Sequence, residues 1–171
     1  MFRTTNRICA INIERLRSLF AYDPESGLLQ WRTSGRGRRS DLVAGVLRHD
    51  GYRVVGIGYQ TFYAHHLIWL YMTNEYPISE IDHINLDPSD NCWTNLRLAT
   101  HSQNGSNKRR AAGNTSGFKG VSWDKNRKKW AAKIKVKGKA MTLGRFNTAE
   151  TAYDAYCDAA RKHFGQFART A

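Results

Sequence analysis

A short segment near the C-terminal end of the chain constrains the fold most strongly. Residues 130–137, WAAKIKVK, alternate strictly along the chain: the even-numbered residues are apolar, and three of the odd-numbered ones are Lys133, Lys135 and Lys137. A period of two is the period of an extended strand whose two faces meet different surroundings. The segment therefore predicts a half-buried strand with three ammonium groups aligned on its open face.

The residues that follow predict a second strand and a helix. A turn at Gly138 leads into AMTLGRF, which reads as another strand. Residues 147–165, NTAETAYDAYCDAARKHFG, place apolar side chains at helical spacing. We expect Asn147 as the N-cap, Glu150 three residues later in a capping box, and Gly165 as the C-cap. The C-terminal region is thus predicted to be a small sheet packed on one helix.

The charge balance indicates an anionic partner. Lys and Arg total 27 against 14 Asp and Glu, which gives a net charge of +13. Nucleic acid is favoured over a membrane surface because no long basic amphipathic helix is evident; a basic protein kept soluble by its charge is the alternative. We find no apolar run long enough for a signal peptide or a membrane span, so an intracellular protein is expected. The three cysteines are scattered and favour neither a disulfide framework nor a zinc knuckle.

The N-terminal part mixes helical and extended patterns. Residues 12–20 have helical spacing, YDPESG reads as a turn, and LLQWR reads as a strand. The loop TSGRGRRSD either contacts phosphates or is a solvated connection. GYRVVGIGYQTFYAHH predicts a hairpin with Gly56 and Gly58 near its bend, and HHLIWLYMTN predicts a helix that ends before Pro77. Further on, THSQNGSNKRR predicts a short helix that runs into a basic tail.

One stretch of this basic chain is acidic. Residues 80–91, EIDHINLDPSDN, hold four carboxylates around a single histidine. Asp82 and His83 are adjacent, so on a strand their side chains point to opposite sides and can serve different purposes at one phosphate. The other polar residues of the stretch, Asp87, Asp90 and Asn91, are expected to form turns rather than to bind a ligand. An exposed acidic loop is the alternative for the whole stretch.

The segment IDHINLDPSDNCWTNLRLATHSQN resembles the core of the HNH endonucleases, particularly the homing endonucleases of phages and group I introns. The resemblance implies a ββα-metal fold in which two strands and a helix surround one divalent metal. It implies that His83 is the general base, that Asp82 and Asn104 are the metal ligands, and that Asn95 fixes the loop that orients the histidine. Two oxygen ligands suit Mg²⁺ or Mn²⁺.

The sequence departs from the family pattern at three positions. Leu86 and Asn74 stand where family members commonly have glycine, and His66 stands where arginine is frequent. A side chain at position 86 leaves the geometry of the loop after His83 open. His65, which precedes His66 at the start of the predicted helix, either supports the site or is structural.

The C-terminal region, GFKGVSWDKNRKKWAAKIKVKGKAMTLGRFNTAETAYDAYCDAARKHFG, resembles the APETALA/ethylene-response-factor DNA-binding domain. The resemblance implies a three-stranded antiparallel sheet that lies in the major groove, with Lys119, Lys133 and Lys135 facing DNA. Further DNA contacts are expected from their neighbours: Trp123, Arg127 and Arg145. A merely solvated basic face is the alternative.

These observations predict an α+β protein in which a ββα-metal HNH core with N-terminal strands and helices precedes a three-stranded antiparallel sheet on one helix. We expect an N-terminal supporting region at 1–60, the nuclease core at 61–110, a linker at 111–117 and the DNA-binding domain at 118–171. The predicted function is Mg²⁺- or Mn²⁺-dependent cleavage of double-stranded DNA by a phage-encoded monomer in the cytoplasm of a bacterial host. No membrane and no small-molecule cofactor are expected. A DNA-binding regulator with a degenerate HNH fold is the alternative.

Overall fold

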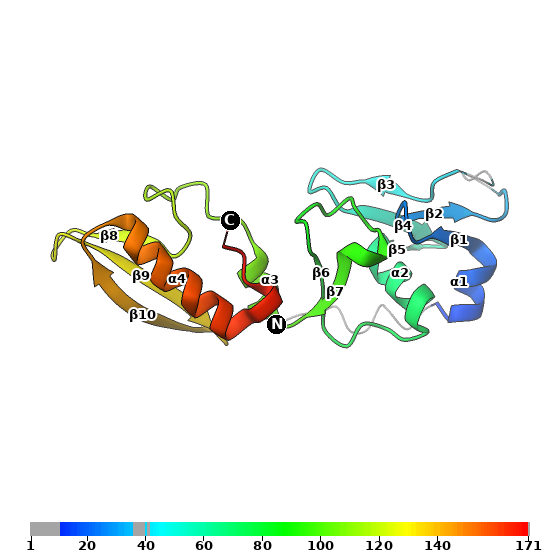
Figure 1. Ribbon diagram of the computed structural model, residues 1–171. Helices are drawn as coiled ribbons and strands as arrows, with labels where there is room; N and C mark the ends of the chain where they lie inside the picture. The colour runs from blue at the N-terminus through cyan, green and yellow to red at the C-terminus, as the bar shows by residue number, and fades with distance from the viewer. Residues whose placement is uncertain (1–10, 36–39, 41, 171) are drawn as a thin grey trace. The chain divides into compact units, whose positions relative to one another are not determined.

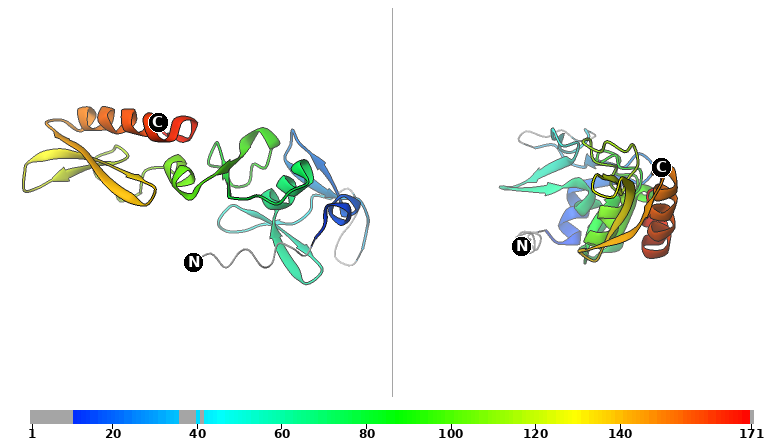
Figure 2. Two further views of the ribbon diagram at one scale, coloured as in Figure 1. Left: turned by 90° about the horizontal axis from the view of Figure 1, so that it is seen from below. Right: turned by 90° about the vertical axis from the view of Figure 1, so that its left-hand side faces the viewer.

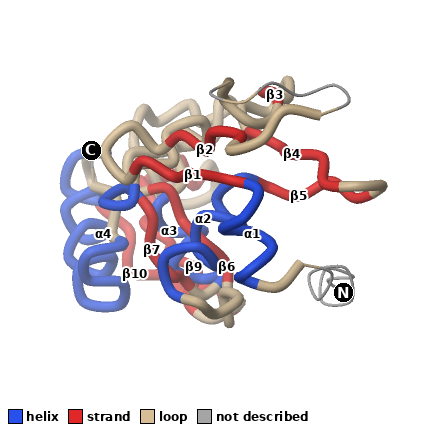
Figure 3. The backbone as a smooth tube through the Cα atoms, turned by 90° about the vertical axis from the view of Figure 1, so that its right-hand side faces the viewer, coloured by secondary structure: helices blue, strands red, loops and turns tan. Residues whose placement is uncertain are grey.

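The computed structural model of the chain describes residues 11–35, 40 and 42–170 (Figure 1). The chain forms two compact units, Met1–Leu98 and Ala99–Ala171, and each is treated by itself below. Both combine helices with small antiparallel sheets (Figure 3), which confirms the predicted α+β class. None of the helices in the described part of the chain is long and apolar enough to cross a membrane.

The first unit packs two helices against short hairpins. In chain order its elements are α1 (Ile13–Leu19), β1 (Phe20–Asp23), β2 (Leu28–Trp31), β3 (Val46–Leu47), β4 (Arg53–Ile57), β5 (Gln60–Tyr63), α2 (Ala64–Thr73), β6 (Glu80–His83), the 3₁₀ helix η2 (Trp93–Asn95) and β7 (Leu96–Ala99). The strands pair as β1-β2, β3-β4-β5 and β6-β7. β7 ends at Ala99, the first residue of the second unit.

The apolar core of this unit explains its elements. Leu16 of α1, Phe20 of β1, Val55 of β4 and Leu67 of α2 are all fully buried in one cluster. The Asn12 side chain caps α1 by accepting a hydrogen bond from the Arg15 N–H at 2.8 Å. The helix expected at 12–20 and the hairpin expected to bend near Gly58 are both confirmed. The basic loop TSGRGRRSD lies partly outside the described residues.

The second unit contains the predicted sheet and helix. Its elements are α3 (His101–Asn107), β8 (Val121–Asp124), β9 (Lys129–Val136), β10 (Lys139–Phe146), α4 (Ala149–Phe164) and the 3₁₀ helix η3 (Gly165–Phe167). The strand order is β10-β9-β8, all antiparallel, and α4 runs along one face of this sheet (Figure 2). Ala132 and Ile134 of β9 are buried under Ala152 and Tyr156 of α4, which confirms the alternation read from the sequence.

The expected start of α4 is wrong by one residue. Thr148, not Asn147, is the N-cap, because the Thr148 hydroxyl accepts the Thr151 N–H at 3.2 Å. Glu150 lies in the first turn, where a carboxylate favours the positive end of the helix dipole, but the capping box with Asn147 does not form. The C-cap is Gly165, as predicted, with a φ of 52°.

The short helix α3 is built into the second unit. Ala99, just before it, lies in one apolar cluster with Phe164 and Phe167. The Ser102 hydroxyl accepts the Lys137 N–H at 3.0 Å. The compact units therefore divide at Leu98/Ala99, whereas the sequence places a functional boundary at the linker 111–117. The helix assigned to the nuclease core folds with the DNA-binding sheet.

Candidate active site and nucleic-acid interface

Asp82 and His83 occupy the end of β6. Only 3% of the Asp82 surface and 6% of the His83 surface are exposed, so the alternative of an open acidic loop does not describe them. Asp82 Oδ2 accepts hydrogen bonds from Arg97 Nε at 2.9 Å and Arg97 Nη2 at 2.8 Å. A buried carboxylate requires a counter-charge, and Arg97 on the neighbouring strand β7 supplies it. The N-L-R tripeptide that contains Arg97 was visible in the sequence, but only the strand pairing reveals its partner.

The His83 imidazole is oriented by Asn91. His83 Nε2 lies 3.2 Å from Asn91 Oδ1, and Asn91 Nδ2 donates to the Ser89 carbonyl at 3.1 Å. With the amide held in this direction, Oδ1 accepts a hydrogen bond from Nε2–H, and a neutral imidazole carries its lone pair on Nδ1. Asn91 is 1% exposed and does more than turn the chain, which the sequence pattern did not indicate.

Burial favours the neutral form of His83. Burial lowers its pKa below the usual value, while the hydrogen bond to Asn91 and then the charges of Asp82 and Asp90 oppose the shift. The net direction is downward, so the imidazole is a base rather than a cation at neutral pH. This is the state in which a histidine can take a proton from water.

Asn95 fixes the loop that follows His83. Its Oδ1 accepts the Asn85 N–H at 3.0 Å, and its Nδ2 donates to Asn85 Oδ1 at 3.0 Å and to the Asp90 carbonyl at 2.8 Å. Its own carbonyl accepts the Ile84 N–H at 2.9 Å. These contacts hold both ends of the loop that follows His83.

Asp87 and Asp90 form turns, as predicted. Asp87 Oδ1 accepts the backbone N–H of Ser89 at 2.9 Å and its hydroxyl at 2.6 Å. Asp90 Oδ1 accepts the Cys92 N–H at 3.1 Å, and Asp90 Oδ2 accepts Asn85 Nδ2 at 2.6 Å. Such bonds stabilise the ionised form and lower the pKa of both carboxyl groups.

The two positions where family members commonly have glycine keep a glycine-like backbone. Leu86 has a φ of 66° and Asn74, the C-cap of α2, has a φ of 61°. Both values are left-handed, a conformation that asparagine adopts readily but that costs a residue such as leucine roughly 1–2 kcal/mol. The Leu86 N–H donates to the His83 carbonyl at 3.0 Å, which closes the turn behind the histidine. The loop geometry is therefore retained with leucine in place.

A cluster of aromatic rings packs against His83. The His65 ring centroid lies 5.1 Å from that of His83 at an angle of 83°, and Tyr52 lies 5.9 Å from His83. Tyr63 stacks on His65 at 5.4 Å. His65 is 6% exposed, its Nδ1 has no hydrogen-bond partner among the described residues, and burial holds its pKa well below the usual value. A neutral His65 thus packs beside His83. The His66 ring centroid lies 4.5 Å from that of His65, and His66 is only partly buried.

The two expected metal ligands lie in different units. Asp82 belongs to the first, while Asn104 lies on α3 of the second, one turn after the N-cap Thr100. No group of three or more His, Cys, Asp or Glu side chains in the described residues could hold a metal. A carboxylate and an amide oxygen are nevertheless a suitable donor pair for Mg²⁺ or Mn²⁺, and a metal at Asp82 would share that carboxylate with Arg97.

The sheet of the second unit presents a basic face. Lys133 and Lys135 are exposed and point away from the side that α4 covers. Arg145 pairs with Ala131 across the strands, and cross-strand partners point to the same side, so it shares the face with Lys133. Arg145 Nε also donates to Asp124 Oδ2 at 2.8 Å.

Three other residues expected at the DNA have partners within the unit. Trp123 pairs with Trp130, on the side of the sheet opposite the lysines, with ring centroids 5.1 Å apart. Arg127 is exposed in the turn between β8 and β9, 3.6 Å from Asp124 Oδ2. Lys119 is half-buried, and its Nζ donates to the Ser106 carbonyl and, at 2.7 Å, to the Lys108 carbonyl at the end of α3.

Two regions of the chain match known protein families. Residues 62–106 match the HNH endonuclease family model, and residues 116–166 match the AP2 domain model. The chain is 37% identical over 89 residues to "Protein 3.8" of Escherichia phage T7, a stretch that covers 52% of this chain and 73% of that protein. No solved structure matches the chain.

Proposed function

The chain belongs to the HNH endonuclease family and carries an AP2 domain, and from this premise we propose that it is a metal-dependent DNA endonuclease of the homing type. It hydrolyses phosphodiester bonds in double-stranded DNA through a ββα-metal core. The observation that carries the proposal is the pair Asp82 and His83, buried at the end of β6 with separate, defined partners. A degenerate site would not be expected to keep both.

His83 acts as the general base. Asn91 holds Nε2–H, so Nδ1 is the atom that takes the proton from the attacking water. Burial keeps the ring neutral, and His65 with Tyr52 restricts its rotation by packing against it. His65 is therefore proposed as a supporting residue that positions the base and does not touch the substrate.

Asp82 and Asn104 would supply oxygens to a divalent metal, and Asn95 would act indirectly by fixing the loop after His83. When bound, Mg²⁺ or Mn²⁺ would stabilise the charge that develops on the phosphate and on the leaving 3′ oxygen. Arg97 keeps the Asp82 carboxylate in place by two hydrogen bonds. With two protein ligands, metal affinity is weak until water and DNA oxygens complete the coordination shell.

The C-terminal domain anchors the enzyme on duplex DNA. Lys133, Lys135 and Arg145 share one exposed face, which suits contact with phosphates and base edges in the major groove. Lys119, Trp123 and Arg127 are further proposed contacts, and each also has a partner within the unit: a backbone carbonyl, Trp130 and Asp124 respectively. Lysine favours phosphate contact over bidentate reading of guanine.

The cellular setting is part of the proposal. A phage protein is 37% identical to the chain, which supports a phage-encoded enzyme that acts in the cytoplasm of an infected bacterium. We further propose that it acts as a monomer without a small-molecule cofactor. Its DNA partner is the phage or host genome.

The test is cleavage of a supercoiled plasmid library with random inserts, in Mg²⁺ and in Mn²⁺. We expect the wild type to nick or linearise plasmids that carry the target and His83→Ala to leave them intact. His101→Ala is the matched control, because His101 is an exposed histidine of α3. An intact library with every metal, together with retained DNA binding, would instead identify a DNA-binding regulator.

A further inference from the structure

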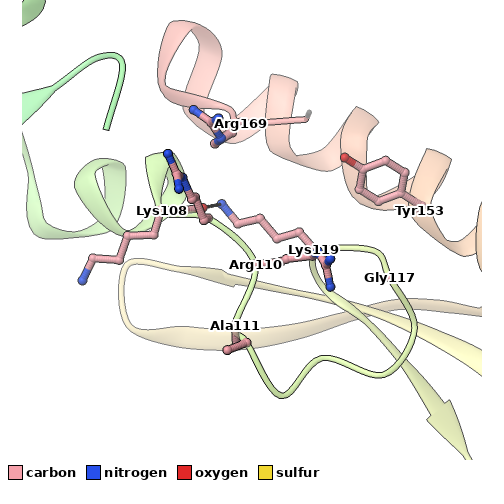
Figure 4. A pocket seen from close by; sticks show the side chains of 9 residues that line it. Lys108, Arg110, Ala111, Gly117, Lys119, Tyr153 and Arg169 are labelled. Atoms are coloured by element: carbon pink, nitrogen blue, oxygen red, sulfur yellow. Dashed lines mark hydrogen bonds between the residues drawn. The ribbon is translucent and has the colours of Figure 1, made fainter. Parts of the chain in front are cut away.

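The second unit contains a pocket whose charged lining residues are all cationic (Figure 4). The cavity has a volume of about 450 Å³. Five cationic side chains line it, and no acidic residue does: Lys108, Arg109, Arg110, Lys119 and Arg169. Like charges gathered around one cavity repel one another, and a bound anion would offset that repulsion.

Three separate parts of the chain build the pocket. They are the segment 108–119, which leaves the end of α3 and returns to β8, Tyr153 of α4, and Arg169 after η3. Side-chain bonds fix the returning segment: Asn114 Nδ2 donates to the Phe118 carbonyl at 2.8 Å, and Ser116 Oγ donates to the Val121 carbonyl at 2.9 Å. The predicted linker is therefore an ordered wall of a cavity.

Two of the cations are held in a way that calls for an anion. Arg169 Nε is buried and has no hydrogen-bond partner among the described residues. Lys119 is fixed by the carbonyls of Ser106 and Lys108, and burial, followed by the charge of Arg169, lowers its pKa to about 8. An anion between them would satisfy the guanidinium and offset the repulsion.

We propose that this pocket binds a phosphate group of the DNA backbone, as a contact separate from the lysine face of the sheet. Arginine and lysine donors around a small cavity match a phosphate, and arginine binds its oxygens through paired N–H groups. The lining includes Tyr153 of α4, on the side of the sheet opposite Lys133 and Lys135. The phosphate therefore belongs to a part of the DNA that flanks the base pairs contacted by Lys133 and Lys135.

The inference rests on the proposed function only in taking DNA as the ligand, and the first experiment does not use DNA. The full chain is titrated with inorganic sulfate while backbone amide resonances are followed by NMR. We expect saturable shifts at Gly117 and Lys119 in the wild type and in Lys162→Gln, whose exposed lysine on α4 does not line the pocket. Arg169→Gln should weaken binding by about tenfold. Absence of saturable shifts, or equal binding by both variants, overturns the proposal.

The second experiment identifies the source of the phosphate. Binding of duplex DNA is measured against salt concentration for the same three proteins. Arg169→Gln should reduce the slope of log affinity against log salt by about 1, and Lys162→Gln should not. Sulfate binding with an unchanged DNA slope would overturn the assignment to the DNA backbone. Neither measurement requires cleavage, so a failed nuclease assay leaves both results interpretable.

Discussion

The charged groups of the two units are arranged in opposite ways. In the first unit, Asp82, His83 and Asn95 are buried, and neighbouring side chains or backbone groups hold each of them. On the sheet of the second unit, Lys133 and Lys135 stand in solvent on a rigid strand. Chemistry at a phosphate requires fixed atoms, whereas attraction of a polyanion requires only accessible charge. Mutations at the buried site should therefore change the cleavage rate or the stability, whereas mutations on the lysine face should change the affinity for DNA.

The largest effect is expected at His83. His83→Ala removes the proposed base and should lower the cleavage rate by about 10²–10⁴-fold with DNA affinity unchanged. Single-turnover cleavage and gel-shift titration measure the two quantities separately. His101→Ala serves as control, and an equal loss of rate in both variants would contradict a specific role for His83.

Asp82→Asn should damage both stability and activity. The change leaves the Arg97 guanidinium, only 13% exposed, without its carboxylate. We expect the free energy of unfolding, measured by denaturant titration with a metal chelator present, to fall by about 3 kcal/mol.

The double variant Asp82→Asn with Arg97→Met separates the two roles. It removes the stranded charge and should recover part of the stability but none of the cleavage. Recovery of cleavage along with stability would show that Asp82 is structural and not a metal ligand.

The lysine face should respond in binding and not in stability. Lys133→Ala with Lys135→Ala should lower DNA affinity and reduce the salt slope by about 2, because each lysine is proposed to contact one phosphate. The free energy of unfolding, measured by thermal denaturation, should stay within about 0.5 kcal/mol of the wild-type value. A double substitution of Arg161 and Lys162 on α4 removes the same amount of charge at another place and serves as the control. An equal loss of DNA affinity in both double variants would mean that net charge, and not contact by the lysine face, determines binding.

Lys119 provides a pH test of the half-buried cation. Its pKa is lowered to about 8, so the ammonium is charged below that pH and loses its proton above it. Sulfate binding by the pocket should therefore weaken as the pH rises through about 8. Lys119→Arg stays charged throughout and should remove this dependence. If the affinity of the wild type for sulfate did not change with pH, Lys119 would not be one of the groups that bind the anion.

The smallest effect is expected in the turn behind His83. Leu86 is left-handed at a φ of 66°, and glycine adopts this conformation without strain. Leu86→Gly should raise the free energy of unfolding by roughly 0.5–1 kcal/mol. Leu86→Ala keeps the strain and loses the side chain, so it should not stabilise. A gain in both variants would mean that the side chain, not the backbone, causes the strain.

Several elements could be predicted from local sequence because local physics decides them. The alternation at 130–137 placed β9 and its buried face, and Gly165 ended α4. The start of α4 was missed because Asn147 and Thr148 are both good caps, and one residue of helix register separates them. At the site, Asp87 and Asp90 bond to neighbours two residues away, a range at which turn chemistry can be read.

Contacts between distant residues could not be predicted in this way. Arg97 reaches Asp82 across 15 positions, and Asn91 and His65 meet His83 only after strands and helix pack. Lys119 and Arg169 are 50 positions apart, and no local pattern brings them to one pocket.

The sequence by itself determined the α+β class, the family, the pair Asp82–His83 and the strand with its lysines, because periodicity and motif spacing are local properties of the chain. Only the tertiary structure decided which groups neutralise or orient that pair, that α3 folds with the sheet, and that basic residues of the segment 108–119 share one cavity with Arg169. The physical reason is that burial and pairing of charges depend on which distant segments the apolar core brings together.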